Sequence, residues 1–156
     1  MNYADIKYPD VANGEGIRVS LFVSGCRLNC YNCFNKEAQN FEYGKPYTKE
    51  TKEYILDKLS LNYIKGLSIL GGDPMEIENQ KDIAELVKDA KILYPEKDIW
   101  IWTGRVYPNI DYTPYTLDIL NNIDYLVDGP FMDDKKDLSL KWRGSSNQRI
   151  LNKNDL

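Results

Sequence analysis

The sequence predicts an α/β protein whose sheet is mainly parallel. Two observations lead to this fold class. Short segments rich in β-branched and aromatic residues alternate with longer amphipathic segments, and most of the short segments end in glycine or aspartate. The chain has 156 residues, which is the size of one domain, and it shows no repeat, low-complexity stretch or linker. We therefore expect one domain over residues 1–156.

The first half of the chain contains two predicted strands around one helix. The segment 17–23 (IRVSLFV) has the composition of a strand and runs directly into Ser24-Gly25-Cys26. Residues 48–63 are a predicted helix, with Thr48 as N-cap and Ile55, Leu56 and Leu59 on its inner face. The segment 66–70 (GLSIL) is a short buried strand that ends at two glycines.

The second half repeats this alternation. A second helix is predicted where apolar residues recur at helical spacing around residues 83–90, and it ends before Pro95. Residues 98–103 (DIWIWT) form a strand, and Thr113-Pro114 opens a helix through residue 121, as a cap followed by proline at the first helical position. Two further short strands are predicted at 124–127 and 148–151.

Four unusual loops each follow a predicted strand. They contain the cysteines, Gly71-Gly72-Asp73-Pro74, Thr103-Gly104 and Asp128-Gly129-Pro130. Because the carboxyl ends of parallel strands lie at one edge of a sheet, and ligands bind outside that edge, we expect the four loops to meet there.

All three cysteines of the chain, Cys26, Cys30 and Cys33, fall within eight residues, and the chain has no histidine. Thiols this close together are typical of a shared metal centre, and the lack of imidazole excludes Cys₂His₂ and Cys₃His zinc sites, HExxH proteases and Ser-His-Asp triads. The spacing leaves three protein ligands and one vacancy. A [4Fe–4S] cluster with one open iron, a zinc site completed by a carboxylate, and a loop of inert thiols all fit this pattern.

Charge and hydropathy exclude other classes. The net charge is −4 with lysine and arginine spread along the chain, which argues against a nucleic-acid partner. No apolar run approaches the roughly 20 residues that span a bilayer, and no signal peptide is recognisable, so we expect no membrane association. Crowded cysteines suit a reducing compartment, and we expect a cytoplasmic protein.

The motif Cys26-x₃-Cys30-x₂-Cys33 is the signature of the radical S-adenosylmethionine superfamily, and GGDP resembles that superfamily's methionine-binding turn. The segments NGEGIRVSLFVSGC, CFNK, DIWIWTG, LVDGPF and WRGSSNQ extend the match from about residue 13 to residue 150. Together they resemble the activating proteins of anaerobic ribonucleoside-triphosphate reductases.

This resemblance implies an incomplete, open βα barrel and two cofactors, a [4Fe–4S] cluster and S-adenosylmethionine. The open iron would be chelated by the methionine amine and carboxylate, and one electron would cleave the sulfonium to a 5′-deoxyadenosyl radical. That radical would take hydrogen from a glycine of the large reductase subunit, leaving a glycyl radical. The implied partners are that subunit, as protein substrate, and an electron donor such as flavodoxin.

The resemblance also implies roles for individual residues. Cys26, Cys30 and Cys33 would ligate the cluster, and the backbone of Asn32, Cys33 and Phe34 would lie along the adenine. It also implies that Gly71, Gly72, Asp73 and Pro74 surround the methionine end of S-adenosylmethionine, with Thr103 and Asp128 nearby. Contacts to the cofactor or to the docking partner are implied for Arg143, Ser145 and Asn147, and a docking face for Phe131, Met132 and Trp142.

Two rival hypotheses remain. One is a small-molecule radical enzyme similar to a deazaguanine synthase, against which the WTG and RGSSNQ segments argue. The other is a non-enzymatic zinc or electron-transfer module.

Overall fold

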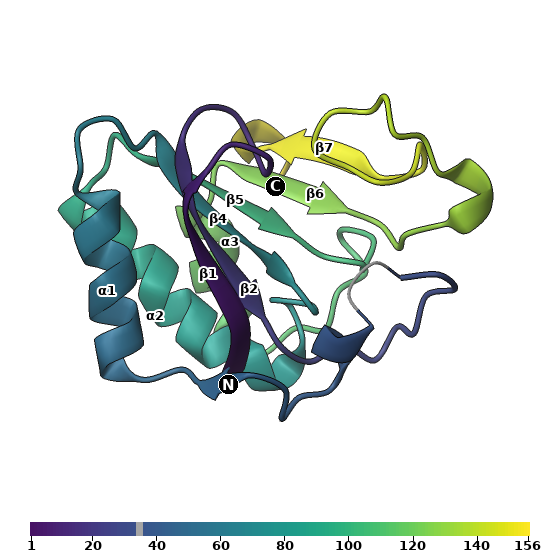
Figure 1. The fold of residues 1–156 in the computed structure, drawn as a ribbon, viewed down its shortest axis with the longest axis horizontal. Helices are drawn as coiled ribbons and strands as arrows, with labels where there is room; N and C mark the ends of the chain where they lie inside the picture. The colour runs from purple at the N-terminus through teal and green to yellow at the C-terminus, as the bar shows by residue number, and fades with distance from the viewer. Residues whose placement is uncertain (34–35) are drawn as a thin grey trace.

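A computed structural model describes residues 1–33 and 36–156, which build one seven-stranded sheet and three α-helices (Figure 1). The strands are β1 (Asn2–Asp10), β2 (Arg18–Val23), β3 (Lys45–Pro46), β4 (Gly66–Gly71), β5 (Asp98–Trp102), β6 (Tyr125–Asp128) and β7 (Arg149–Asn152). The helices are α1 (Lys49–Leu59), α2 (Ile77–Leu93) and α3 (Thr116–Asn122), with short 3₁₀ turns at Glu37–Gln39, Asp133–Lys135 and Lys153–Asp155.

The strand order is β3-β1-β2-β4-β5-β6-β7, and the sheet is open. The pairs β2–β4, β4–β5 and β5–β6 are parallel, and each is joined through one of the three helices, as parallel neighbours require. The outer pairs β1–β2, β1–β3 and β6–β7 are antiparallel. The α/β class is confirmed, while the parallel arrangement that we expected holds for the four central strands and not for the edges.

The predicted elements are present, with shifted ends. Thr48 caps α1, since its Oγ1 accepts the Thr51 N–H at 3.4 Å, but the helix ends at Leu59 instead of residue 63. The third helix begins at Thr116 and not at Pro114, because Thr113 and Thr116 turn their hydroxyls to the buried Gln80 side chain at 2.8 and 2.6 Å. The sequence analysis missed β1, which is polar, and the two-residue β3.

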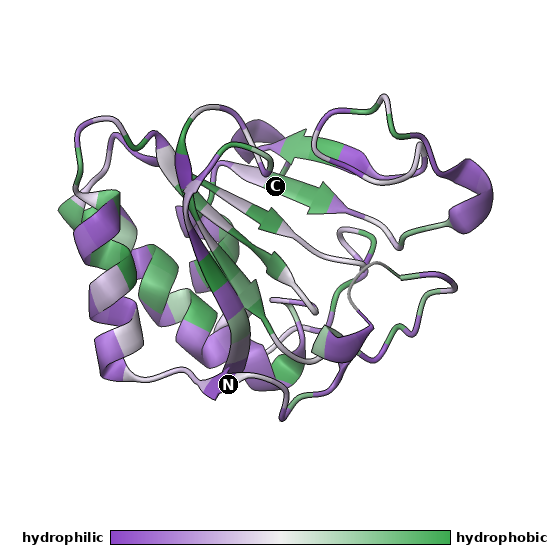
Figure 2. Ribbon diagram, viewed as in Figure 1, coloured by the Kyte–Doolittle hydropathy of each residue, from purple (hydrophilic) through white to green (hydrophobic). Residues whose placement is uncertain are grey.

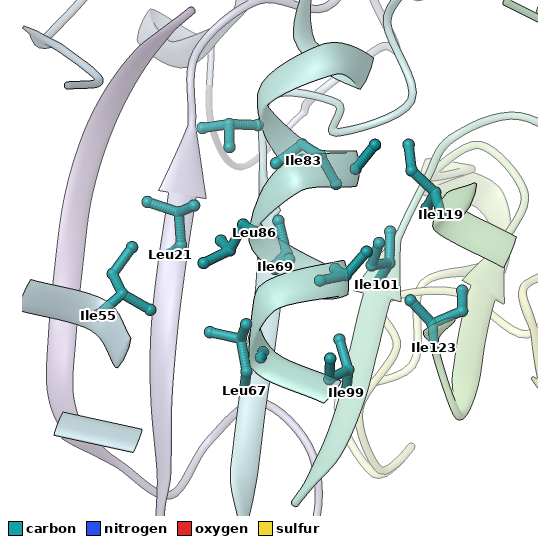
Figure 3. Packing of buried hydrophobic residues seen from close by; sticks show 14 of the residues in the cluster. Leu21, Ile55, Leu67, Ile69, Ile83, Leu86, Ile99, Ile101, Ile119 and Ile123 are labelled. Carbon is teal, nitrogen blue, oxygen red and sulfur yellow. The ribbon is translucent and has the colours of Figure 1, made fainter. Parts of the chain in front are cut away.

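The core lies between one face of the sheet and the helices. Alternate residues of β2, β4 and β5 point to this face, and Figure 3 shows the side chains of Leu21, Leu67, Ile69, Ile99 and Ile101 against those of α2. Apolar and polar residues alternate along α1 and α2 (Figure 2), and the buried apolar ones, among them Ile55, Leu59, Ile83 and Leu86, belong to this core. Each fully buried Leu or Ile contributes about 1.5–3 kcal/mol to stability. None of the helices in the described ranges is long and apolar enough to cross a membrane.

The opposite face of the sheet carries a buried cation and an aromatic cluster. Arg18 is fully buried, pairs with Asp98 at 2.6 Å and donates to the Ser68 hydroxyl at 2.6 Å. Its guanidinium carbon lies 5.8 Å from the Trp100 ring centroid, and Trp100 packs against Trp102 and Trp142. Burial lowers the pKa of Arg18, and the Asp98 carboxylate opposes that shift. Arg18 therefore holds β2, β4 and β5 together on the face that the helices leave uncovered.

We predict that Arg18→Ala lowers the free energy of unfolding by about 3 kcal/mol, because it leaves Asp98 and several acceptors without their buried partner. Lys88→Ala is the control, since Lys88 forms an exposed pair with Asp118 at 3.4 Å and should cost under about 1 kcal/mol. Chemical denaturation of both variants measures the difference, and equal losses would contradict this role for Arg18.

Candidate functional site

The loops that follow the four parallel strands line one cavity of about 530 Å³. The carboxyl ends of β2, β4, β5 and β6 point to the same side of the molecule, where residues 24–33 and 36–40 and the long loop before β7 also lie (Figure 1). The volume is in the range of small-molecule sites. Its lining includes Cys26, Cys30, Cys33, Gly71, Gly72, Thr103, Gly104, Gly129, Phe131 and Arg143. The predicted meeting of four loops is confirmed.

The cysteine loop is closed at its base and tightly turned within. The Gly25 N–H donates to the Ala38 carbonyl at 2.6 Å, and the Cys26 N–H donates to the Gln39 carbonyl at 3.1 Å. Asn29 and Asn32 have left-handed backbone angles, with φ of 49° and 53°, a conformation that asparagine tolerates better than most residues. These turns bring three half-buried thiols to the same cavity.

The thiols of Cys26 and Cys30 are protonated at neutral pH in the metal-free protein. Burial raises the pKa of Cys26 to about 11 and also raises the pKa of Cys30. Backbone N–H groups of Leu28 and Phe131 bond to these two thiols and oppose the shift. A cysteine nucleophile needs a lowered pKa, whereas a metal removes the proton outright when it binds. The electrostatics therefore suit a metal ligand and not a nucleophile.

The thiol arrangement is compatible with a four-iron cluster. Within residues 1–33 and 36–156, no three Cys, Asp or Glu side chains gather closely enough to hold a single metal ion. A four-iron cluster places each thiolate on a different iron, so its ligands stand farther apart. Three thiols around one cavity, with N–H groups directed at two sulfurs, fit such a cluster with one iron left without a protein ligand.

The turn after β4 passes close to the base of the cysteine loop. Gly71 has φ of 115°, and a Cβ on it would lie 2.5 Å from the backbone of Val23. A Cβ on Gly72 would lie 2.7 Å from the carbonyl oxygen of Gly25. The Asn79 side chain then donates at 3.0 Å to the carbonyls of both Ser24 and Asp73. Both glycines are required for this close approach, and their backbone borders the cavity.

Asp73 is fully buried, is not among the lining residues, and is surrounded by hydrogen-bond donors. Its carboxylate accepts from the Thr103 hydroxyl at 2.9 Å, the Gly104 N–H at 3.0 Å and the Met75 N–H at 2.9 Å. Arg105 pairs with it at 2.8 Å. Burial raises the pKa of Asp73, and Arg105 with the other donors opposes that shift. Asp73 thus joins the turn after β4 to the turn after β5, and Pro74 is buried beside it.

Thr103 and Asp128 lie at the neighbouring ends of β5 and β6, but only Thr103 lines the cavity. Thr103 borders the cavity, while Asp128 is buried and binds Arg149 through both carboxylate oxygens, at 3.0 Å from Nε and 2.5 Å from Nη2. Asp128 also accepts the Tyr107 N–H at 2.8 Å. Its carboxylate therefore fixes the ends of β6 and β7, and Gly129 is the residue of this turn that reaches the cavity.

The segment 143–148 folds onto the turn after β6. Asn147 donates to the Pro130 carbonyl at 2.8 Å, and the buried Ser145 hydroxyl accepts the Met132 N–H at 3.2 Å. Arg143 and Trp142 line the cavity, as does Phe131. Asn32 is exposed, and Phe34 lies outside the described residues. Of the segment's three predicted contacts, Arg143 therefore borders the cavity, while Ser145 and Asn147 hold the loop around it.

Sequence reasoning missed several residues of the site. Lys7 lines the cavity from β1, a strand that was not predicted. Arg105 and Glu76 form an ion pair behind the cavity wall. Arg105 follows the Thr103-Gly104 turn by one residue, and Glu76 follows the Gly71-Gly72-Asp73-Pro74 turn by two. A charged residue one or two positions after a strand-end loop is the signal that could have identified Arg105 and Glu76.

Comparisons with known proteins agree on one family. Residues 12–151 match the model of a 4Fe-4S single cluster domain. The anaerobic ribonucleoside-triphosphate reductase-activating protein of Escherichia coli K12 is 43% identical over 152 residues, which cover 96% of this chain and 97% of that protein. The proteins of the same name from Enterobacteria phage T4 and Vibrio cholerae are 40% and 43% identical, and each match covers at least 96% of both chains.

We predict that Asp73→Asn lowers the free energy of unfolding by about 3 kcal/mol, because Arg105 loses a fully buried partner. Asp111→Asn is the matched control, since Asp111 pairs with the same Arg105 at 3.1 Å but is 54% exposed, and its loss should cost under about 1 kcal/mol. Urea denaturation at pH 7 distinguishes the two, and a control that is destabilised as much as Asp73→Asn would refute the assignment.

Proposed function

Because the chain belongs to the family of anaerobic ribonucleoside-triphosphate reductase-activating proteins and contains its 4Fe-4S single cluster domain, we propose that it activates such a reductase with a [4Fe–4S] cluster and S-adenosylmethionine. The observation that carries the proposal is the convergence of three cysteine thiols and four strand-end loops on one cavity. When bound, these cofactors would supply one-electron reductive cleavage of the sulfonium to methionine and a 5′-deoxyadenosyl radical, which would take a hydrogen atom from a glycine of the reductase.

We assign Cys26, Cys30 and Cys33 as the three protein ligands of the cluster, and the open iron as the position for the methionine amine and carboxylate. The Gly71-Gly72 backbone and Thr103 border the same cavity and are the proposed contacts of the methionine end. For Asp73, Pro74 and Asp128 the proposed role is indirect, because these buried residues fix the turns that form the wall. Asn32 and Cys33 remain the proposed backbone contacts of the adenine.

The cavity wall is suited to orienting a ligand and excluding water. Apolar side chains form much of the wall, among them Leu28, Leu70, Trp102, Phe131 and Leu140. The charged side chains among the described lining residues are Lys7 and Arg143, both cationic, and no carboxylate or imidazole stands among those residues. A wall of this kind leaves the reaction to the cofactors and restricts competing hydrogen donors.

We also assign the sheet to the incomplete βα barrel of the radical S-adenosylmethionine enzymes. Its four central strands are parallel, their loops gather at one edge, and the sheet stays open between β3 and β7. An open side lets a partner insert a glycine loop, with Phe131, Met132 and Trp142 as the proposed docking residues. The proposed partners are the large reductase subunit and an electron donor such as flavodoxin, and the proposed compartment is the cytoplasm.

We predict that anaerobic reconstitution with iron and sulfide gives a [4Fe–4S]⁺ EPR signal that changes when S-adenosylmethionine is added, and that a glycyl radical then forms on the reductase. Loss of an outer-shell residue typically lowers metal affinity or activity 10–100-fold. Because Cys30 is proposed as a direct ligand of the cluster, Cys30→Ala should lower radical formation at least about 100-fold. The secondary structure of the variant should remain, because Cys30 lies in a loop outside the core.

Ile92→Ala, at an exposed position of α2, is the control and should behave like the original protein. A glycyl radical of normal yield in Cys30→Ala would refute the ligand assignment. Stoichiometric zinc in place of iron would favour a structural metal module, and cleavage of S-adenosylmethionine without any radical on the reductase would favour a small-molecule enzyme.

A further inference from the structure

The buried carboxylate of Glu76 contacts the cysteine loop next to its first cysteine. Glu76 is 1% exposed, and its Oε2 accepts the backbone N–H of Arg27 at 2.6 Å. Its Oε1 pairs with the Arg27 guanidinium at 3.0 Å. Glu76 thus binds both the main chain and the side chain of the residue that follows Cys26.

Glu76 stands where a helix-capping side chain would be expected, but it contacts the cysteine loop. Glu76 is the N-cap residue of α2, yet its side chain forms no capping hydrogen bond and turns toward the cysteine loop instead. On its other side Arg105 pairs with Oε1 at 2.7 Å, and Arg105 also pairs with Asp73. The charge of Glu76 is therefore stabilised between two arginines, and the loop is connected to the turns after β4 and β5.

The part of the loop that Glu76 holds has few other attachments. The base hydrogen bonds end at Cys26, while Leu28 and Asn29 are exposed. The guanidinium of Arg27 is itself 56% exposed and also contacts Glu78 and the Phe41 ring. Because exposed ion pairs contribute little, the buried hydrogen bond from the Arg27 N–H is the contact expected to restrain the backbone.

We propose that Glu76 is a positioning residue that holds the Cys26 end of the cysteine loop in its metal-binding conformation before the cluster is present. The inference depends on the proposed function only for the identity of the bound group. A preformed loop places the thiols before binding, so less conformational entropy is lost when they ligate, and the bound cluster is released more slowly.

Two readouts test the proposal. In the metal-free protein, amide hydrogen exchange of Arg27, followed by NMR, should be about tenfold faster in Glu76→Ala than in the original chain, because its acceptor is gone. After reconstitution, a chelator should remove iron about 10–100-fold faster from this variant. Glu76→Gln should be intermediate, since a neutral oxygen remains as a weaker acceptor.

Glu78→Gln is the matched control, because Glu78 contacts the Arg27 side chain and not its backbone, and it should change neither readout. Equal exchange and iron-loss rates in Glu76→Ala and the original chain would overturn the proposal, as would a control that matches Glu76→Ala. If Glu76→Ala does not fold, Glu76→Gln must still show faster Arg27 amide exchange and faster iron loss than Glu78→Gln. Equal rates in these two variants would overturn the proposal. An original chain that binds no cluster would refute the proposed function, while the exchange comparison would still decide the role of Glu76.

Discussion

The site depends on the buried carboxylate of Asp73. This one group receives donors from the turn after β4 and from the turn after β5, including Arg105 at 2.8 Å. Arg105 continues to Glu76, which holds Arg27 of the cysteine loop. Three loops that are far apart in the sequence are thereby fixed relative to one another, behind the cavity wall. An unpaired carboxylate at this depth would be costly, so the network forms completely or the loops separate.

Charge is distributed so that the acids lie behind the wall and the cations face the cavity. Asp73, Glu76 and Asp128 are each nearly or fully buried against arginines, while Lys7 and Arg143 line the cavity. The site thus contains the protonated thiols of Cys26 and Cys30, backbone N–H groups and apolar walls, and it lacks a histidine. Such a site fits chemistry performed by bound cofactors, with the protein providing position and shelter.

Much of the fold and of the site could be predicted from the sequence. The core strands were recognisable because Val19, Leu21, Leu67 and Ile69 are buried and β-branched or aliphatic, and the rim loops because each follows such a strand. The strand β1 could not be found, since it is polar and is stabilised mainly by pairing with β2. The roles of Asp73 and Asp128 were also not predictable, because whether a carboxylate faces a cavity or an arginine depends on long-range contacts with Arg105 and Arg149.

The most direct test of the account is Mössbauer spectroscopy of the protein reconstituted with ⁵⁷Fe, recorded with and without S-adenosylmethionine. Three thiol ligands around one cavity predict a four-iron cluster in which one iron changes its signal when the ligand is added, while the other three do not. Four irons that respond equally, or no change at saturating ligand, would contradict the claim that this cavity presents an open iron to S-adenosylmethionine.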